Sequence, residues 1–232
     1  EKNMNEKPTG IRIIIKELLK DKLALGSLIL LAIISCGNKT KSKTEEVKGI
    51  DKKYLEYVDS LKSENDLKIK MGEEPITIVG KKLKVGDKIT QVPLVVNAKL
   101  EEKNIFDDKN IKVLYTAPSL DTKVCSIQTK ILNDEAKKNP DIKFYSITED
   151  TPFAQTRFCT ENDINGIKAI SDSKYHQFGL QNGLFIKEKG LLTRALIILD
   201  KDNTVKYIEY VSDEKNEVDI DKALDFLKKM KK

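Results

Sequence analysis

Residues 111–125 read IKVLYTAPSLDTKVC, and this stretch indicates the fold. Its first six residues are rich in β-branched and aromatic side chains, which favour a strand. Pro118 has no N–H for a ladder of backbone hydrogen bonds, so the strand should end before it. Apolar residues then recur at helical spacing as far as Leu132, and an Asn-Pro pair at 139–140 ends that pattern. We therefore expect an inner strand, a short loop and a helix that begins around Thr122.

Cys125 falls in the first turn of that expected helix. The backbone N–H groups of a first turn have no partners within the helix, and they carry the positive end of its dipole. Both features stabilise a thiolate over a thiol. Thr122 stands one helical turn before Cys125, so its hydroxyl can reach the sulfur or an oxygen bound beside it. The sequence therefore predicts a reactive cysteine just beyond the end of an inner strand.

The rest of the chain from Glu74 onward alternates between strand and helix patterns. We expect strands at 76–79, 81–85, 92–96, 111–116, 141–148, 195–199 and 205–211, and helices at 122–138, 151–158 and 218–230. The first two strands should form a hairpin with its turn at Gly80. This order predicts one α/β domain over residues 74–232, with a mixed central sheet and an N-terminal β-hairpin.

The composition excludes several classes of protein. The chain has 232 residues, 39% hydrophobic and 34% charged, which is enough for one good-sized core. Only one hydrophobic run is long enough to concern a membrane, so a multi-spanning protein is excluded. The net charge of +5 is spread along the chain, and there is no Trp, so we expect no nucleic-acid partner. One His and three Cys are too few for an ordinary zinc site, and we expect neither metal nor cofactor.

A second cysteine lies in the sequence DTPFAQTRFC, residues 150–159. Thr followed by Pro near its start is typical of a helix N-terminus. In an exported protein, Cys125 and Cys159 could form a permanent structural disulfide, the commoner use of such a pair. The proline, the threonine and the helix-start position of Cys125 favour redox catalysis instead.

Arginine is scarce in this chain. Of 42 basic residues only Arg12, Arg157 and Arg194 are Arg. Arg194 opens an expected strand, and Arg157 lies two residues before the second cysteine. A lysine cannot imitate the planar, two-pronged guanidinium, so an arginine kept beside a cysteine motif is a candidate for binding a two-oxygen substrate.

Three segments together resemble one protein family. Residues 118–125 resemble the Pro-x-x-x-Thr-x-x-Cys motif of peroxiredoxins, and in full they are similar to the bacterial thiol peroxidases of that family. Residues 150–159 are similar to the helix that carries the second cysteine in this branch. Residues 193–195 are similar to the start of the strand with the active-site arginine. The resemblance extends over about 74–232.

The resemblance implies a thioredoxin-like fold and a thiol-dependent peroxidase. Cys125 would attack a hydroperoxide and become a sulfenic acid, and Cys159 would condense with it to an intramolecular disulfide. A thioredoxin-like reductant would return both thiols. Arg194 would polarise the peroxide, Thr122 would hydrogen-bond the sulfur, and Pro118 would shield it from solvent. The family also implies a homodimer.

Two features depart from the family pattern. Position 117 is Ala where the family leads us to expect a larger residue lining the pocket, and residues 89–95 lack the usual Ala-x-x-Phe approach to the first inner strand. Two other functions are open to this chain. One is a general thiol–disulfide oxidoreductase, although no Cys-x-x-Cys occurs. The other is a lipoprotein whose domain serves only as a binding module.

Three further residues have two readings each. Arg157 either tunes Cys159 or forms a surface ion pair. His176 is more typical of a surface or packing residue than of a catalytic one. Asp121 is expected to be a helix-start residue, with a direct role in the site as the alternative.

The N-terminus resembles a bacterial lipoprotein signal. Residues 4–22 carry Lys and Arg, residues 23–35 are uncharged and mostly apolar, and Cys36 follows directly. Such a run matches a signal sequence and is shorter than the ~20 residues of a membrane-spanning helix. In the lipobox that 33–36 resembles, the cysteine is lipidated and becomes the first mature residue. The alternatives are an uncleaved anchor or a short signal cut nearby.

This interpretation gives residues 1–35 as a signal, 36–73 as a tether with a possible short helix at 51–64, and the rest as the domain. The protein would then be membrane-anchored through its lipid, on the outer side of the cytoplasmic membrane. Such compartments are held oxidising, so we expect an exported or membrane-bound thioredoxin-like partner. The tether also suggests lipid hydroperoxides as substrates beside hydrogen peroxide.

Overall fold

The computed structural model describes residues 52–230. The expected signal segment 1–35, the expected lipidation site Cys36 and the first part of the tether lie outside the described residues. Among the described residues, no helix combines the length and the apolar character that a membrane crossing requires.

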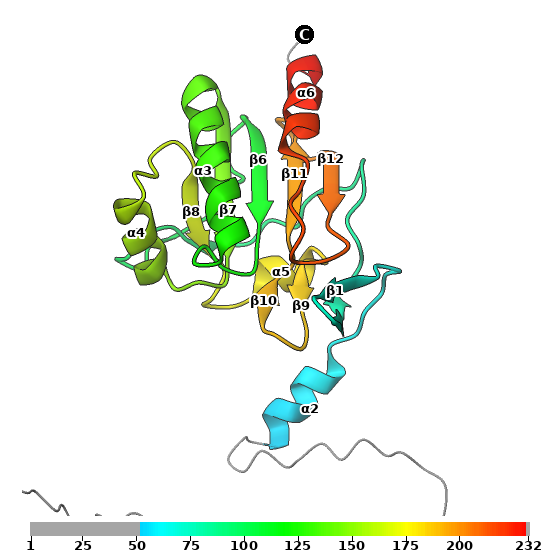
Figure 1. The fold of residues 1–232 in the computed structure, drawn as a ribbon. Coiled ribbons are helices and arrows are strands. Elements are labelled where there is room, and N and C mark those ends of the chain that lie inside the picture. Colours follow the sequence, from blue (N-terminus) through cyan, green and yellow to red (C-terminus); the bar gives the residue numbers. More distant parts are fainter. Residues whose placement is uncertain (1–51, 231–232) are drawn as a thin grey trace, which may run out of the picture. The chain divides into compact units, whose positions relative to one another are not determined.

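A seven-stranded mixed sheet forms the centre of the domain, in the order β12-β11-β6-β7-β8-β4-β5 (Figure 1). Neighbours β6, β7 and β8 run parallel, whereas β11 and β12 on one side and β4 and β5 on the other pair antiparallel. The strands are β4 (Leu94–Val95), β5 (Glu102–Lys103), β6 (Ile111–Thr116), β7 (Ile142–Thr148), β8 (Lys168–Ser171), β11 (Ala195–Leu199) and β12 (Val205–Tyr210). The expected mixed sheet is confirmed, and β6 is an inner strand as its sequence indicates.

Three helices pack on one face of this sheet, and a fourth lies on the other. Helices α3 (Lys123–Lys138), α4 (Pro152–Glu161) and α6 (Ile220–Met230) cover the face that includes Tyr115, whereas α5 (Gln177–Gln181) lies with the opposite face. Side chains alternate along β6, so Tyr115 joins the core under α3 while Leu114 joins the core on the far side. The expected helices at 122–138, 151–158 and 218–230 are thereby confirmed.

The N-terminal hairpin exists, but it lies earlier than its sequence pattern indicates. It consists of β1 (Ile69–Met71) and β2 (Glu74–Ile76), with Gly72 at positive φ in its turn. Gly80 does not turn a hairpin: its N–H donates to the Lys62 carbonyl, and its own carbonyl accepts from the Glu64 N–H. The expected strand 81–85 is also wrong. The Leu83 N–H donates to the Tyr210 hydroxyl and the Lys84 N–H to the Asp87 carboxylate, so these groups pair with side chains and not with another strand.

The folded domain also starts before the expected Glu74, since β1 precedes that residue and pairs with β2. Helix α2 (Lys52–Ser60) agrees with the short helix expected at 51–64. A small three-stranded sheet has the order β10-β9-β3, in which β3 is Ile78–Val79, β9 is Phe185–Ile186 and β10 is Leu191–Leu192. The expected strand 76–79 includes β3, whereas β8, β9 and β10 were not predicted, because strands of two to four residues are too short to show a period.

Candidate active site

Helix α3 begins with Thr122 as its N-cap and places Cys125 in its first turn. The Thr122 hydroxyl lies 2.7 Å from the Cys125 sulfur and donates to it. The predicted contact between these two side chains is confirmed. Cys125 itself is fully buried, so its sulfur meets fixed protein donors in place of bulk water.

Arg194, directly before β11, supplies the second donor to the sulfur. Its Nη1 lies 3.2 Å from the Cys125 sulfur. The guanidinium is almost completely buried, at 2% exposure, and its Nη2 donates to the Glu214 carbonyl at 2.8 Å. The Glu214 carboxylate in turn accepts from the Arg194 backbone N–H and from the Thr193 hydroxyl. The structure thus brings the expected arginine to the expected cysteine, and Glu214 fixes the arginine at its backbone and at one end of its fork.

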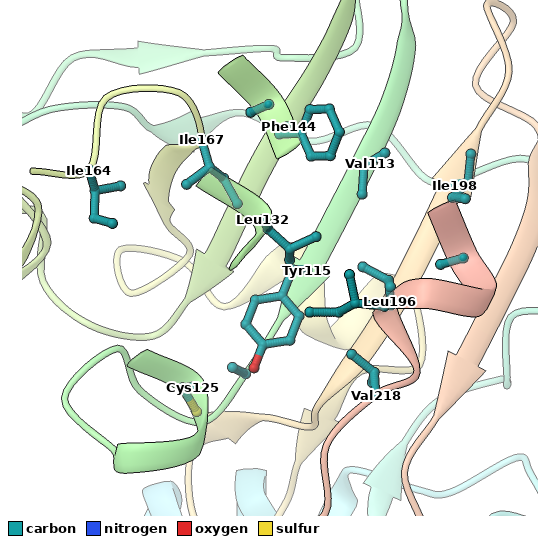
Figure 2. Packing of buried hydrophobic residues seen from close by; sticks show 14 of the residues in the cluster. Val113, Tyr115, Cys125, Leu132, Phe144, Ile164, Ile167, Leu196, Ile198 and Val218 are labelled. Carbon is teal, nitrogen blue, oxygen red and sulfur yellow. The ribbon is translucent and has the colours of Figure 1, made fainter. Parts of the chain in front are cut away.

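Tyr115 is a residue of this site that the sequence analysis missed. Its ring extends from β6 toward Cys125, with the hydroxyl at the near end (Figure 2). Arg194 Nη1 donates to that hydroxyl at 2.5 Å, and the hydroxyl donates to Gln128 Oε1 at 3.1 Å. A signal was available, because a tyrosine on a fully buried strand almost always needs a hydrogen-bond partner.

Cys159 lies on α4 and is half-buried, and its sulfur is free, as is that of Cys125. It packs against the same hydrophobic cluster that contains Cys125, and it also lines a cavity of about 710 Å³ beside β8. Burial raises the pKa of the Cys159 thiol. Both sulfurs are free in this structure, and the sulfur of Cys125 accepts hydrogen bonds from Thr122 and Arg194.

Asp150 ties the loop before Cys125 to the start of α4. Its carboxylate accepts from the Ser119 hydroxyl at 2.8 Å, from the Leu120 N–H at 2.7 Å and from the Thr148 hydroxyl at 2.9 Å. Hydrogen bonds to a charged acceptor are stronger than neutral ones. One carboxylate thus holds the loop of one cysteine against the helix of the other.

Of the remaining expected residues, Pro118 and Ala117 are buried, whereas Arg157 is exposed. Pro118 is buried in the loop between β6 and α3, and Ala117 is fully buried in the cluster with Tyr115 and Cys125. Arg157 forms an exposed ion pair with Asp121 at 3.5 Å, which agrees with the surface reading of that arginine.

His176 does not reach the cysteine site. Its ring stacks at a tilt on Phe185, and its Nδ1 lies 2.8 Å from Glu149 Oε2. The packing interpretation of this histidine is therefore confirmed.

Glu149 and Asp172 form a buried acidic pair next to Asp150. Burial raises the pKa of Glu149 to about 9, and the negative charges of Asp172 and Asp150 act in the same direction. Burial also raises the pKa of Asp172, whose oxygens accept from the N–H groups of Phe178 and Gly179. The pair therefore keeps a proton near neutral pH, and we place that proton on Glu149.

Comparison with known proteins identifies the class of this chain. The Redoxin family matches residues 84–224. The chain is 39% identical over 159 residues to a thiol peroxidase of Bacillus subtilis, covering 68% of this chain and 95% of the relative, and 37% identical over 155 residues to one of Streptococcus agalactiae, covering 66% and 94%. Among solved structures, a peroxiredoxin-like protein of Aquifex aeolicus matches with 32% identity and a TM-score of 0.66, covering 71% of this chain and 98% of the other.

A thiol peroxidase of Chromobacterium violaceum shares the fold, with a TM-score of 0.65 at 21% identity over 72% of this chain and 98% of the other. The chain therefore belongs to the Redoxin family, with the thioredoxin-like fold of the peroxiredoxins. Within that family it is an enzyme of the thiol peroxidase type.

Replacing Asp150 should loosen the loop of Cys125. Asp150→Ala leaves the Leu120 N–H and two hydroxyls without their acceptor, which should lower the free energy of unfolding by about 2–3 kcal/mol. Alkylation of Cys125 by iodoacetamide should become faster, because the loop opens more often. Urea denaturation and alkylation of the Cys159→Ser protein measure the two effects. Asp121→Ala, which removes only an exposed ion pair, is the control and should change stability by less than about 0.5 kcal/mol. Equal effects of the two substitutions would contradict the role of Asp150 in holding the Cys125 loop against α4.

Replacing Glu149 should change how stability depends on pH. A carboxyl whose folded pKa lies above its unfolded value stabilises the fold fully below the unfolded pKa, and this contribution is lost as pH rises toward the folded pKa of about 9. Glu149→Gln imitates the protonated form, so from pH 5 to pH 9 the wild type should lose at least about 1 kcal/mol relative to the variant. Urea titrations at several pH values test this. Glu161→Gln, at the exposed end of α4, is the control, and a wild-type pH slope unchanged by Glu149→Gln would rule out the buried proton.

Proposed function

We propose that this enzyme reduces hydroperoxides at Cys125, with Arg194 and Thr122 as the groups that bind and polarise the peroxide. The observation that carries the proposal is the buried sulfur with two hydrogen-bond donors, one from the Thr122 hydroxyl and one from the Arg194 guanidinium. A sulfur in that setting is stabilised as the thiolate, which is the nucleophilic form. The match to thiol peroxidases supports the same chemistry.

The reaction balances with the groups that are present. The Cys125 thiolate attacks one peroxide oxygen, the O–O bond breaks, and the leaving oxygen takes a proton to give water or an alcohol. The cysteine becomes a sulfenic acid. The Cys159 thiol then displaces water from it and forms the disulfide. A thioredoxin-like dithiol reduces this disulfide by exchange and is itself oxidised.

Arg194 has donors left for the substrate. A guanidinium has five N–H groups. Nη1 uses its two on Tyr115 and Cys125, and Nη2 uses one on Glu214. The buried Nε has no hydrogen-bond partner in the structure. The Nε proton and the second Nη2 proton remain as donors, and a hydrogen bond from the guanidinium to the substrate gains strength as negative charge develops on the leaving oxygen.

The resemblance in residues 150–159 supports Cys159 as the second thiol. Burial raises the pKa of this thiol, which favours its protonated form. Its position in a cavity wall on α4 gives a reductant an opening on this side of the domain. No Cys-x-x-Cys occurs in the chain, which argues against a general thiol–disulfide oxidoreductase. The retention of Cys125, Thr122 and Arg194 in contact argues against a purely binding role.

The proposed function also includes where the protein is located in the cell. Residues 23–36 support export and lipidation at Cys36, and with them a site outside the cytoplasm and a reductant that is itself exported or membrane-bound. A tethered enzyme is placed to meet lipid hydroperoxides, which kinetic comparison with hydrogen peroxide tests. The family resemblance supports a homodimer, which sedimentation equilibrium tests.

Substitution should distinguish the roles of the two cysteines in turnover. With hydrogen peroxide and a thioredoxin system, Cys125→Ser should abolish turnover, because no other sulfur is activated. Cys159→Ser should consume one equivalent of peroxide per protein and then stop, since the sulfenic acid has no partner. Peroxide consumption and mass spectrometry of Cys125 give the readout. Full turnover of Cys159→Ser would show that another group resolves the sulfenic acid.

The lipid anchor should depend on one thiol. Cys36→Ser in the full chain should move the protein out of the membrane fraction and abolish incorporation of labelled fatty acid, because the acceptor sulfur is gone. Wild-type and Cys159→Ser proteins, fractionated in parallel, should remain in the membrane fraction. Membrane retention of Cys36→Ser would favour the uncleaved anchor instead.

A further inference from the structure

Tyr115 occupies a position between the arginine and a glutamine on α3. Its side chain is fully buried on β6. The hydroxyl has three polar neighbours: Arg194 Nη1 at 2.5 Å, Gln128 Oε1 at 3.1 Å and the Cys125 sulfur. Which group donates in the bonds to Arg194 and Gln128 determines whether the hydroxyl can accept from the Arg194 guanidinium and hold it.

Val218 fixes the orientation of the Gln128 amide. Gln128 Nε2 donates to the Val218 carbonyl at 2.9 Å, and the Val218 N–H points to Gln128 Oε1 at 3.4 Å. A flipped amide would set its NH₂ group against the Val218 N–H and its oxygen against the Val218 carbonyl. Gln128 therefore presents its oxygen, an acceptor only, to Tyr115.

The orientation of Gln128 determines that of Tyr115. Burial raises the pKa of the Tyr115 phenol, so it keeps its proton. That proton goes to Gln128 Oε1, because the guanidinium offers no acceptor and the Cys125 sulfur already accepts from Thr122 and Arg194. The lone pairs of the Tyr115 oxygen are then directed at Arg194, which donates one Nη1 proton to them and the other to the Cys125 sulfur.

The two ends of the arginine fork are consequently held by different segments. Nη1 is held by Tyr115 of β6, and Nη2 by the Glu214 carbonyl. A planar guanidinium anchored at both nitrogens cannot rotate about its long axis, so the remaining donors have one direction in space. Without the Tyr115 oxygen, Nη1 keeps only the Cys125 sulfur as a partner.

We propose that Tyr115, oriented by Gln128, is a positioning residue that holds the Arg194 guanidinium against the Cys125 sulfur in the geometry that receives the peroxide. This role rests on the peroxidase function proposed above. Ala117, which directly follows β6, is small and lies in the same hydrophobic cluster as Tyr115.

A double-mutant cycle with two reagents tests this role. The full-length Cys159→Ser protein is reduced, and the second-order rate constants of Cys125 with hydrogen peroxide and with iodoacetamide are measured. Iodoacetamide needs the sulfur but not the arginine donors. Tyr115→Phe keeps the ring and removes only the hydroxyl. We expect it to slow the peroxide reaction roughly tenfold and to change alkylation less than about threefold.

The cycle is completed with Arg194→Lys, in which the fork is already lost. Tyr115→Phe should then slow the peroxide reaction less than about twofold further, because the tyrosine acts through the arginine. Tyr145→Phe, on the neighbouring strand β7 and also buried, is the matched control and should leave both rates unchanged. If Tyr115→Phe does not fold, Gln128→Met, which removes the acceptor, should give the same selective loss.

Three outcomes would overturn the role of Tyr115 alone, with the peroxidase intact. The first is a peroxide rate constant unchanged by Tyr115→Phe. The second is an equal fall in the rate constants with peroxide and with iodoacetamide. The third is a loss from Tyr115→Phe that is as large in the Arg194→Lys protein as in the protein with Arg194. Failure of the otherwise wild-type Cys125 to react with peroxide would instead overturn the proposed function, and the role of Tyr115 with it.

Discussion

The contact between the Arg194 guanidinium and the Cys125 sulfur is the interaction on which the rest of the site depends. A buried guanidinium loses its hydration and must find acceptors inside the protein. Arg194 finds them in the sulfur, the Tyr115 hydroxyl and the Glu214 carbonyl. Burial alone would lower the pKa of Arg194, but the acceptors around the guanidinium raise it, so the arginine stays charged. This cation would stabilise the thiolate that the proposed reaction requires at Cys125.

The fold supplies these partners from segments that are far apart in the chain. The sulfur comes from the first turn of α3, the arginine from the start of β11 and the Glu214 carbonyl from the segment between β12 and α6. The central sheet brings them together because β6 pairs directly with β11, with Thr116 opposite Ala195. The ends of these two strands meet where the helix of Cys125 begins, which places the cysteine and the arginine side by side.

The sequence predicted the part of the site that is encoded locally. Strand β6, the proline that ends it and the spacing of Thr122 and Cys125 on one helical turn are short-range features, and the structure confirms their geometry. Arg194 could be singled out because arginine is so rare in this chain. Tyr115 and Gln128 could not be assigned, because their partners Arg194 and Val218 are 79 and 90 residues away.

The misplaced hairpin has a similar cause. Gly80 has the left-handed φ that a turn requires, and the pattern around it is that of two strands. The segment at 62–65 competes for its backbone, since Asn65 also donates to the Gly80 carbonyl at 2.7 Å. Strand β3 pairs with β9, more than a hundred residues later in the chain, and no local pattern reports such a choice.

A crystal structure of the Cys125→Ser protein soaked with hydrogen peroxide tests the central claim most directly. We expect a peroxide beside position 125, with an oxygen in a hydrogen bond to the Arg194 guanidinium and the guanidinium still anchored on Tyr115 and Glu214. A peroxide bound away from Arg194, or a guanidinium turned away from position 125 when peroxide is bound, would contradict it.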